Sequence, residues 1–281
     1  MAADKRLGSP IELPLRRATA PPEAPLPPIP SQTDTRNCNF IKYGSPYDQL
    51  GRVFIGFSRS WNGVDAIEFQ EGSAVGFVNH CAFESKDLPL EHIVRVSHPN
   101  ILDFKEIFLC KGNIYFLYWS WGVTLKEIRQ LFPVFQLSEV EVAIVCRSVL
   151  RALTYLHKDL DICFGELSST NVLITKEGEV KIAGMGQSLL KRPKSNSTGK
   201  ARDVQAVCSI ARKLLRLDDV AKVRGTIGLL AEDFSGAPPT ATADDLLKHP
   251  FLQVDVVPWC LAPVHMLYTV ARDRKQELGG S

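Results

Sequence analysis

The sequence lacks several features that mark particular protein classes. No apolar run reaches the 18 residues that a membrane span needs, so we expect no contact with a membrane. Its 33 Lys and Arg are nearly balanced by 31 Asp and Glu, which argues against a dedicated nucleic-acid binder with its strong basic excess. The charged N-terminus is followed by prolines and not by an apolar core, so we expect no signal peptide.

The seven cysteines form no CxxC pair, their number is odd, and several lie within apolar runs. This pattern predicts buried free thiols in a reducing compartment, and therefore a cytoplasmic or nuclear protein. The 281 residues, 45% apolar and 23% charged, have the composition of an ordinary globular protein. They suffice for a substantial core in one large domain or two smaller lobes.

The composition changes along the chain and predicts four parts. Residues 1–36 are proline-rich and predict a disordered tail, which is either a linker or, through "PPEAPLPPIP", a docking peptide. Residues 37–118 are rich in strand patterns and residues 119–255 in helix patterns. Residues 256–281 form a C-terminal extension whose apolar stretch either packs back on the preceding part or serves as a partner surface.

Strands dominate the first folded part and helices the second. The interval Glu84 to Ser97 is ambiguous, because its apolar residues have helical spacing. Ser138 and Glu141 form a capping box at the start of a long helix. The expected strands lie in "GRVFIGF", "DAIEF", "SAVGFV", "ILDFKEIFL" and "NIYFLYW", and the first expected helices in "TLKEIRQLF" and "LSEVEVAIVCRSVLRALTYLHKDL".

One long segment, "LTYLHKDLDICFGELSSTNVLITKEGEVKIAGMG", resembles the catalytic region of protein kinases. "HPNIL", "ADDLLKHPFL" and "ARDVQAVCSIARKLL" match further kinase segments in the right order, over about residues 45–253. The sequence "EVAIVCRSVLRALTYLH" most resembles the STE-group, PAK-like serine/threonine kinases. The resemblance implies an α+β, two-lobed fold, with a small antiparallel β lobe and a shortened helical lobe.

The resemblance also shows which catalytic groups have changed in the large lobe. The HRD motif becomes Phe164, Gly165 and Glu166, so the base position carries a longer carboxylate. The DFG motif becomes Gly184, Met185 and Gly186, and glycine offers a magnesium ion no side-chain oxygen. Asn171, the other metal-ligand position, is kept, either for metal binding or for hydrogen bonds within its own loop.

In the small lobe, too, the residues that bind ATP in kinases are replaced or displaced. The phosphate-binding lysine of the third kinase strand falls on Gly76, or on Phe77 if the register slips by one residue. The glycine-rich loop keeps only Gly56 and Gly63, with Arg59 and Trp61 between them. The helix glutamate that pairs with the lysine has its nearest equivalent, Glu91, two positions out of register.

The segment between the lobes, "FLYWSWG", could still offer backbone groups to an adenine ring. We expect Leu117 at the back of that pocket, with Tyr118 and Trp119 in the degenerate nucleotide-binding cleft. Trp119 and Trp121 either stack on a ligand or close the cleft.

The segment after the DFG position is too short for a full substrate-binding segment. Residues 191–200 predict a flexible basic loop, and the central helix of the large lobe is expected at 201–215, opening at Asp203. Asp203 is expected to cap the amides of the catalytic loop. Phe164 and Met185 keep apolar bulk where the family stacks a hydrophobic column.

Together these changes predict a pseudokinase that acts as a scaffold or allosteric partner in signalling. Its expected partners are proteins, an active kinase or its substrates, and no cofactor is expected, although weak ATP binding stays open and magnesium binding is disfavoured. The alternatives are a divergent serine/threonine kinase using Glu166 and Asn171, another transfer enzyme, and a decaying gene product. A cation in the cleft beside those two residues, such as Lys86 or Arg59, would favour the kinase.

Overall fold

The structure is a computed structural model, and it divides the chain into two units, Met1–Arg36 and Asn37–Ser281. The first unit coincides with the proline-rich tail expected from the sequence, and its linker and docking interpretations lie outside the described residues. The structure describes residues 40–48, 52–56, 66–69, 76–83, 90, 93–191, 196–218, 226–254 and 258–279.

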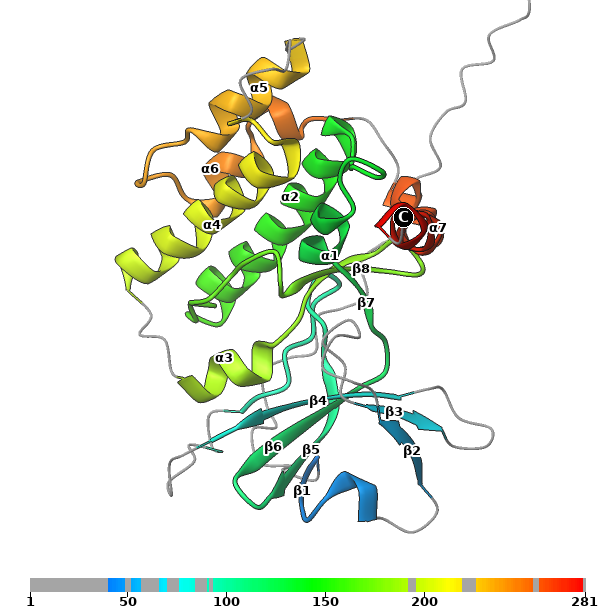
Figure 1. The fold of residues 1–281 in the computed structure, drawn as a ribbon. Helices are drawn as coiled ribbons and strands as arrows, with labels where there is room; N and C mark the ends of the chain where they lie inside the picture. Colours follow the sequence, from blue (N-terminus) through cyan, green and yellow to red (C-terminus); the bar gives the residue numbers. More distant parts are fainter. Residues whose placement is uncertain are drawn as a thin grey trace, which may run out of the picture. The chain divides into compact units, whose positions relative to one another are not determined.

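A six-stranded sheet forms the small lobe (Figure 1). All neighbouring strands are antiparallel except one pair at the edge, where β1 runs parallel to β5. The strand order is β1-β5-β6-β4-β3-β2, with bounds β1 Ile41–Tyr43, β2 Val53–Gly56, β3 Ala66–Phe69, β4 Gly76–Ala82, β5 Phe104–Cys110 and β6 Asn113–Tyr118.

The edge strand β1 was not expected from the sequence, because its three residues are too short for a strand pattern. A 3-10 helix, Pro46–Asp48, follows it. Lys42 on β1 bonds Glu106 on β5 at 2.5 Å, and Arg52 reaches the other oxygen of Glu106 at 2.8 Å while also pairing with the buried Glu68. The ion pair between Lys42 and Glu106 therefore helps to hold β1 against β5.

The two faces of the sheet pack against different neighbours, because side chains alternate along each strand. One face contributes to the interlobe cluster, in which Leu173 and Ala183 of the large lobe join the sheet. The other face carries the outer-face cluster, made of small-lobe residues alone. The interlobe cluster comprises Ile93, Leu102, Phe104, Ile107, Ile114, Phe116, Tyr118, Leu173 and Ala183, and the outer-face cluster Ala66, Val78, Phe108 and Leu117.

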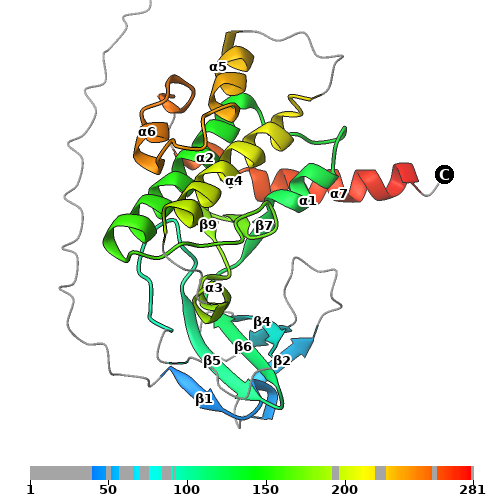
Figure 2. The ribbon, with the colours of Figure 1, turned by 90° about the vertical axis from the view of Figure 1, so that its left-hand side faces the viewer.

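Helices make up most of the large lobe (Figures 1 and 2). Capping boxes start α1 at Thr124 and Glu127 and α2 at Ser138 and Glu141, the second as expected from the sequence. The helices are α1 Leu125–Gln130, α2 Glu139–Thr154 with a π-helical turn Tyr155–Asp159, α3 Met185–Lys191, α4 Ser197–Leu215, α5 Thr226–Ser235, α6 Ala243–Leu247 and α7 Val264–Gly279, with short 3-10 helices at Pro250–Leu252 and Pro258–Leu261.

One local expectation was wrong, and the interval left ambiguous is described only in part. Residues 191–200 are not a single loop, because α3 ends at Lys191 and α4 already begins at Ser197, six residues before Asp203. Asn196 caps α4 by accepting a hydrogen bond from Gly199 N–H at 2.7 Å. In the ambiguous interval, residues 93–98 form no helix, and most of residues 84–92 lie outside the described part of the chain.

A second sheet and the last helix complete the large lobe. The sheet has the order β7-β8-β9 and leads directly to Gly184. The apolar extension packs back on this lobe, since Leu261, Val264 and Tyr268 are buried in its core, while Met266 stays 64% exposed. The strands are β7 Gly122–Thr124, β8 Val172–Thr175 and β9 Val180–Ile182.

None of the helices formed by the described residues combines the length and apolar character needed to cross a bilayer.

Candidate functional site

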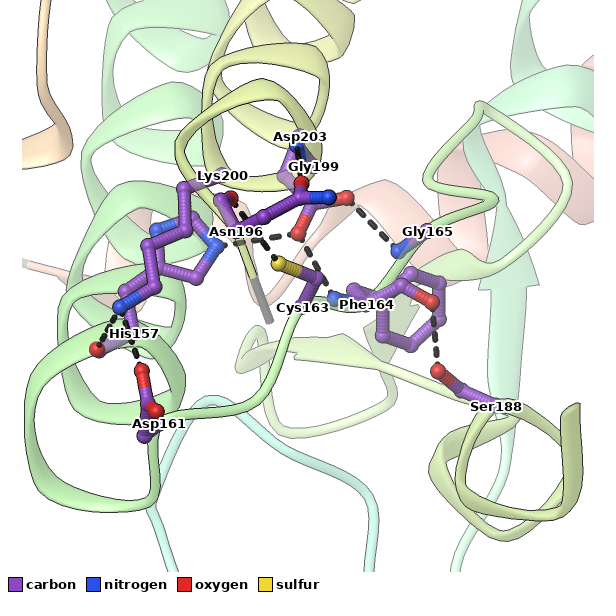
Figure 3. Close-up of polar contacts among 10 residues, drawn as sticks. All are labelled: His157, Asp161, Cys163, Phe164, Gly165, Ser188, Asn196, Gly199, Lys200 and Asp203. Atoms are coloured by element: carbon purple, nitrogen blue, oxygen red, sulfur yellow. Dashed lines mark hydrogen bonds and ion pairs between the residues drawn. The ribbon is translucent and has the colours of Figure 1, made fainter. Parts of the chain in front are cut away.

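Asp203 anchors the loop that corresponds to the kinase catalytic loop (Figure 3). It lies on α4 with 1% of its surface exposed. Its carboxylate accepts hydrogen bonds from the backbone N–H groups of Phe164 and Gly165, both at 2.7 Å, and lies 3.0 Å from Nε2 of His157. A buried carboxylate is stable when several donors satisfy it, so this contact orders the loop, as the sequence led us to expect of Asp203.

His157, Cys163 and Asp203 place their possible metal-ligating atoms within 4.8 Å of one another. The Asp203 oxygens already accept three hydrogen bonds, and the Cys163 thiol lies 3.8 Å from the carbonyl of Asn196. These contacts account for the cluster as a structural junction between the catalytic loop and α4.

Glu166, at the position of the catalytic base, points to solvent with its side chain 70% exposed. Its carboxylate pairs with the ammonium group of Lys191, at the end of α3, at 2.5 Å. The structure thus places a cation beside Glu166, although it comes from a helix and not from the strand that supplies the phosphate lysine in kinases.

Asn171 uses both ends of its amide within its own loop. Its Oδ1 accepts from Ser168 N–H at 2.9 Å, and its Nδ2 donates to the carbonyl of Glu166 at 2.9 Å. These bonds fit the loop-bracing role expected of a loop asparagine. A magnesium ion would lack the second ligand as well, because Gly184 offers no side-chain oxygen, and the residues present therefore do not fit the ion.

Gly184 adopts a left-handed backbone with φ +86°, and α3 begins at the next residue. Among the described residues, a Cβ at Gly184 would meet only Oε1 of Gln187, at 3.7 Å, although the positive φ would strain any residue with a side chain here. Crowding at the β-carbon therefore does not account for the missing aspartate.

Helix α3 lies between the small-lobe sheet and the large-lobe helices in both ribbon views (Figures 1 and 2). A Cβ added at Gly186 would collide with the ring of Phe116, so glycine allows the helix to approach the sheet closely. Leu190 packs on the interlobe cluster. Helix α3 also contacts the large lobe, because the hydroxyl of Ser188 donates a hydrogen bond to the carbonyl of Phe164.

One hydrogen bond joins the two lobes where phosphate-binding groups would be expected. Nε2 of Gln187, on α3, donates to Oδ1 of Asn79, on β4, at 3.0 Å. Asn79 faces the large lobe, because it pairs with Phe116 of the interlobe cluster. Two neutral amides therefore bridge the lobes close to Phe77, the alternative lysine position, and to Gly184, the metal-aspartate position.

The register of β4 corrects the assignment of the phosphate lysine to Gly76. Gly76 shares a face with Val78, and a Cβ on it would come within 2.9 Å of both Glu68 and Leu117, so it points away from the large lobe. The alternative, Phe77, faces the large lobe and packs on the interlobe cluster. A shift of one residue reverses the face of every side chain in a strand.

The same alternation corrects the placement of Leu117 at the back of the nucleotide pocket. Leu117 belongs to the outer-face cluster, whereas its neighbours Phe116 and Tyr118 belong to the interlobe cluster. Tyr118 is buried, and this burial raises the pKa of its hydroxyl well above the ordinary value. An aromatic ring thus fills space on the face of the sheet that a nucleotide would use.

The two tryptophans of the connecting segment behave differently. Trp121 packs against the ring of Tyr118, with centroids 5.3 Å apart, and helps to close the interlobe cluster. Trp119 is 49% exposed, and the ammonium group of Lys105 lies 3.9 Å from its ring centroid. Of the two, Trp121 is the one that contributes to closure.

The apolar replacements at the motif positions are buried, Phe164 with 3% and Met185 with 2% of its surface exposed. Both residues pack in the large-lobe core, whereas Phe104 of the small-lobe sheet packs in the interlobe cluster.

In the glycine-loop region, Gly56 at the end of β2 pairs with Ala66 of β3. The predictions for this region also concern residues that lie outside the described part of the chain, namely Arg59, Trp61, Gly63, Lys86 and Glu91.

Three residues of this region were missed by sequence reasoning. Asn79, Gln187 and Lys191 match no kinase motif, so a motif search passes over them. The polar Asn79 within the strand run "GFVNHCA" was the one available signal, since an amide that is shielded from water needs a partner.

Comparison with known proteins supports the fold. Residues 88–208 match the protein kinase domain family. The serine/threonine-protein kinase pakA of Dictyostelium discoideum is 31% identical over 91 residues, which are 32% of this chain and 8% of the relative. For the serine/threonine-protein kinase MST20 of Pyricularia oryzae the identity is 29% over 169 residues, 58% of this chain and 17% of the relative.

A third relative, the serine/threonine-protein kinase TAO1-A of Xenopus laevis, is 26% identical over 115 residues, 39% of this chain and 11% of the relative. The chain thus matches less than a fifth of the length of each of these relatives. The similarity covers a kinase-like domain, and the remaining parts of the relatives have no counterpart in these alignments.

Proposed function

With residues 88–208 matching the protein kinase domain and relatives of the STE type, we propose that this chain is a catalytically inactive kinase-fold protein that serves as a binding module in signalling. Its partners are proteins, an active kinase or that kinase's substrates, and its place of action is the cytoplasm or the nucleus.

The observation that carries the proposal is the hydrogen bond between Asn79 and Gln187 across the interlobe face. Phosphoryl transfer depends on cations that neutralise the phosphates and on metal ligands that hold them in line. On β4 the side chains toward the large lobe are those of Phe77, Asn79 and Cys81, and none is cationic. With Gly184 at the aspartate position and these three side chains on β4, the described residues provide neither the metal-binding aspartate nor the strand lysine of kinases.

The kinase alternative has one specific observation in its favour, the pairing of Lys191 with Glu166. In that case Lys191 would neutralise phosphate, Glu166 would accept the proton of the acceptor hydroxyl, and Asn171 would hold the metal. Against it, the pair neutralises itself in the free chain, and the amide of Asn171 already makes two hydrogen bonds.

A phosphotransfer assay on the full chain separates the two functions. The chain is incubated with ATP, magnesium or manganese and a general acceptor protein, with a PAK-like kinase as positive control, and transfer is followed by phosphate label. We expect no transfer above the background of a heat-denatured sample. Transfer that Glu166→Gln or Lys191→Gln abolishes, while Glu179→Gln leaves it intact, would establish the kinase instead.

Restoring the missing aspartate provides a second test. In Gly184→Asp the new β-carbon would make no close contact, and aspartate tolerates a positive φ better than most residues. We expect this variant to bind magnesium-ATP no better than the unmodified chain, because no strand lysine accompanies the new carboxylate. Metal-dependent nucleotide binding by Gly184→Asp would show that the rest of the site is intact and would weaken the proposal.

A further inference from the structure

The two edges of the small-lobe sheet differ in how they are covered. At one edge β1 pairs with β5, and at the other edge β2 is the last strand (Figure 1). Among the residues that the structure describes, no strand pairs with the outer side of β2. Every second residue of an edge strand directs its backbone N–H and C=O groups outward, where they can bind a further strand.

The sequence of β2 has none of the usual protections against such pairing. Edge strands are commonly protected by a lysine, a proline or a β-bulge. The strand Val53–Gly56 contains no lysine and no proline, and its register with β3 runs without a break. Valine and isoleucine also favour strands over other structures. We therefore expect β2 to bind another extended segment.

Two side chains of β2 lie exposed on one face of the sheet. Val53 is 62% exposed and Ile55 is 49% exposed. Phe54, between them, points to the opposite face, where it packs against the outer-face cluster. The half-exposed ring of Tyr47 extends this aromatic surface, with its centroid 5.1 Å from that of Phe54. The occupant of this edge therefore has to cover aliphatic side chains on one face and an aromatic ring on the other.

A second copy of β2 meets both requirements. In an antiparallel pair about a twofold axis at Phe54, Phe54 lies opposite Phe54 of the second copy, and Val53 lies opposite Ile55 of the second copy. Residues directly opposite each other share a face of the sheet, so each exposed aliphatic side chain gains an aliphatic neighbour. This register therefore matches like with like on both faces.

Charge does not oppose the pairing of two copies. Arg52 directly precedes β2, and its side chain is bound within its own copy to Glu68 and to Glu106. Like charges that lie opposite each other across two strands destabilise a pair, but here each copy neutralises its own arginine.

From these observations we propose that two copies of this chain pair antiparallel through β2 and form one continuous sheet across a twofold axis. Four residues of an antiparallel strand span about 14 Å. A contact of that length buries less than the roughly 1,200 Å² of a stable interface, so the dimer is weak and depends on protein concentration. This inference goes beyond the proposed function and does not depend on whether the chain transfers phosphate.

Sedimentation velocity of the full chain in a reducing buffer, from about 1 μM to about 300 μM, tests the proposal. We expect the average mass to rise toward that of a dimer. Val53→Lys with Ile55→Lys, and Val53→Glu with Ile55→Glu, place like charges opposite each other, and each double variant should dimerise at least about 10-fold more weakly. An equal mixture of the two should restore the dimer, because every new lysine then faces a new glutamate.

Val270→Lys is the matched control. This valine lies on α7 and is 61% exposed, so the control adds a lysine at an equally exposed aliphatic position away from β2. It should leave the association unchanged. Thermal unfolding of each variant establishes that it is folded.

Amide hydrogen exchange of the unmodified chain provides a readout that needs no variant. Exchange over residues 53–56 should slow at high protein concentration, because the outward N–H groups are then bonded, and exchange over residues 264–270 should not. A chain that stays monomeric, or a dimer with unchanged exchange in β2, would overturn the proposal. So would folded double variants whose mixture stays monomeric, or a dimer that Val270→Lys weakens as much as they do.

Discussion

The region around Asp203 and the interlobe face around Asn79 lie in the same chain but differ in what they keep from the kinase pattern. At Asp203, a buried carboxylate still gathers two backbone amides and a histidine ring. At Asn79, a neutral amide bonds Gln187 where charge would be needed for catalysis. Among the described residues, groups that hold the backbone together are therefore retained, while neutral residues stand at the positions of the strand lysine and the metal-binding aspartate.

The contrast has a physical basis. An unpaired donor in the core costs stability in any folded protein, whatever its function. A lysine or metal-binding aspartate in a cleft contributes to transition-state stabilisation and little to folding. A binding module needs the first kind of group and can do without the second.

Removing Asp203 should have the largest effect on the molecule. Asp203→Ala leaves Phe164 N–H, Gly165 N–H and His157 without their shared acceptor, and we expect a loss of about 3–5 kcal/mol in the free energy of unfolding. Urea denaturation of the full chain measures this loss. Asp273→Ala, at a side chain 59% exposed, is the control and should change stability by less than about 0.5 kcal/mol. A small effect at Asp203 would mean that the loop is not held from α4.

Crowding the interlobe face should have the next largest effect. Gly186→Ala places a methyl group against the ring of Phe116, and overpacking of this kind costs about 1–3 kcal/mol. Adding Phe116→Leu to Gly186→Ala should recover part of the loss, since the smaller side chain makes room. If Gly186→Ala is as stable as the unmodified chain in thermal unfolding, α3 does not pack on the sheet in solution.

The two regions also differ in how far the sequence predicted them. The role of Asp203 and the capping box of α2 depend on residues close in sequence or on a strongly matched segment, and both were expected correctly. The faces of β4 and β6 depend on a register that one residue reverses, and the positions of Gly76 and Leu117 were therefore wrong.

Helix α3 was missed for a related reason. Its seven residues are too few for a helical pattern to stand out, and isolated helices of this length are unstable in water. Packing of Gly186 on Phe116 stabilises it, and this contact joins segments 70 residues apart along the chain, which no local pattern reveals.

The small lobe also contains charged groups that stabilise the fold and have no part in phosphate chemistry. They are Lys42, Arg52, Glu68 and Glu106, which form ion pairs on the outer face of the sheet. Burial raises the pKa of Glu106, but hydrogen bonds from Lys42 and Arg52 outweigh it and leave the pKa below its ordinary value. The stabilising contribution is thus complete above the ordinary value of the unfolded chain, and it is lost as the pH falls through the lower, folded value.

We expect Glu106→Gln to cost about 1–2 kcal/mol at pH 7 and progressively less in acid, as the unmodified carboxyl becomes protonated. Unfolding curves from pH 7 to pH 3 test this, with Glu179→Gln as the matched exposed control. An equal cost at pH 7 and pH 3 would show that Glu106 stabilises the sheet by packing and not by charge.

The smallest effect should come from Glu166 itself. Because its side chain is 70% exposed, Glu166→Ala should change the free energy of unfolding by less than about 1 kcal/mol, despite its place at the catalytic-base position. The unfolding temperatures of Glu166→Ala and Asp203→Ala, measured side by side, test this difference. A large loss of stability at Glu166 would mean that its pair with Lys191 is a structural support.

The central claim is that the interlobe region no longer forms a site for magnesium and ATP. It is tested most directly by thermal unfolding of the full chain with ATP alone, with magnesium alone and with both, beside a PAK-like kinase. The account predicts no shift that requires magnesium, whether or not ATP alone produces a small one. An increase in unfolding temperature that appears only with magnesium and ATP together would contradict it.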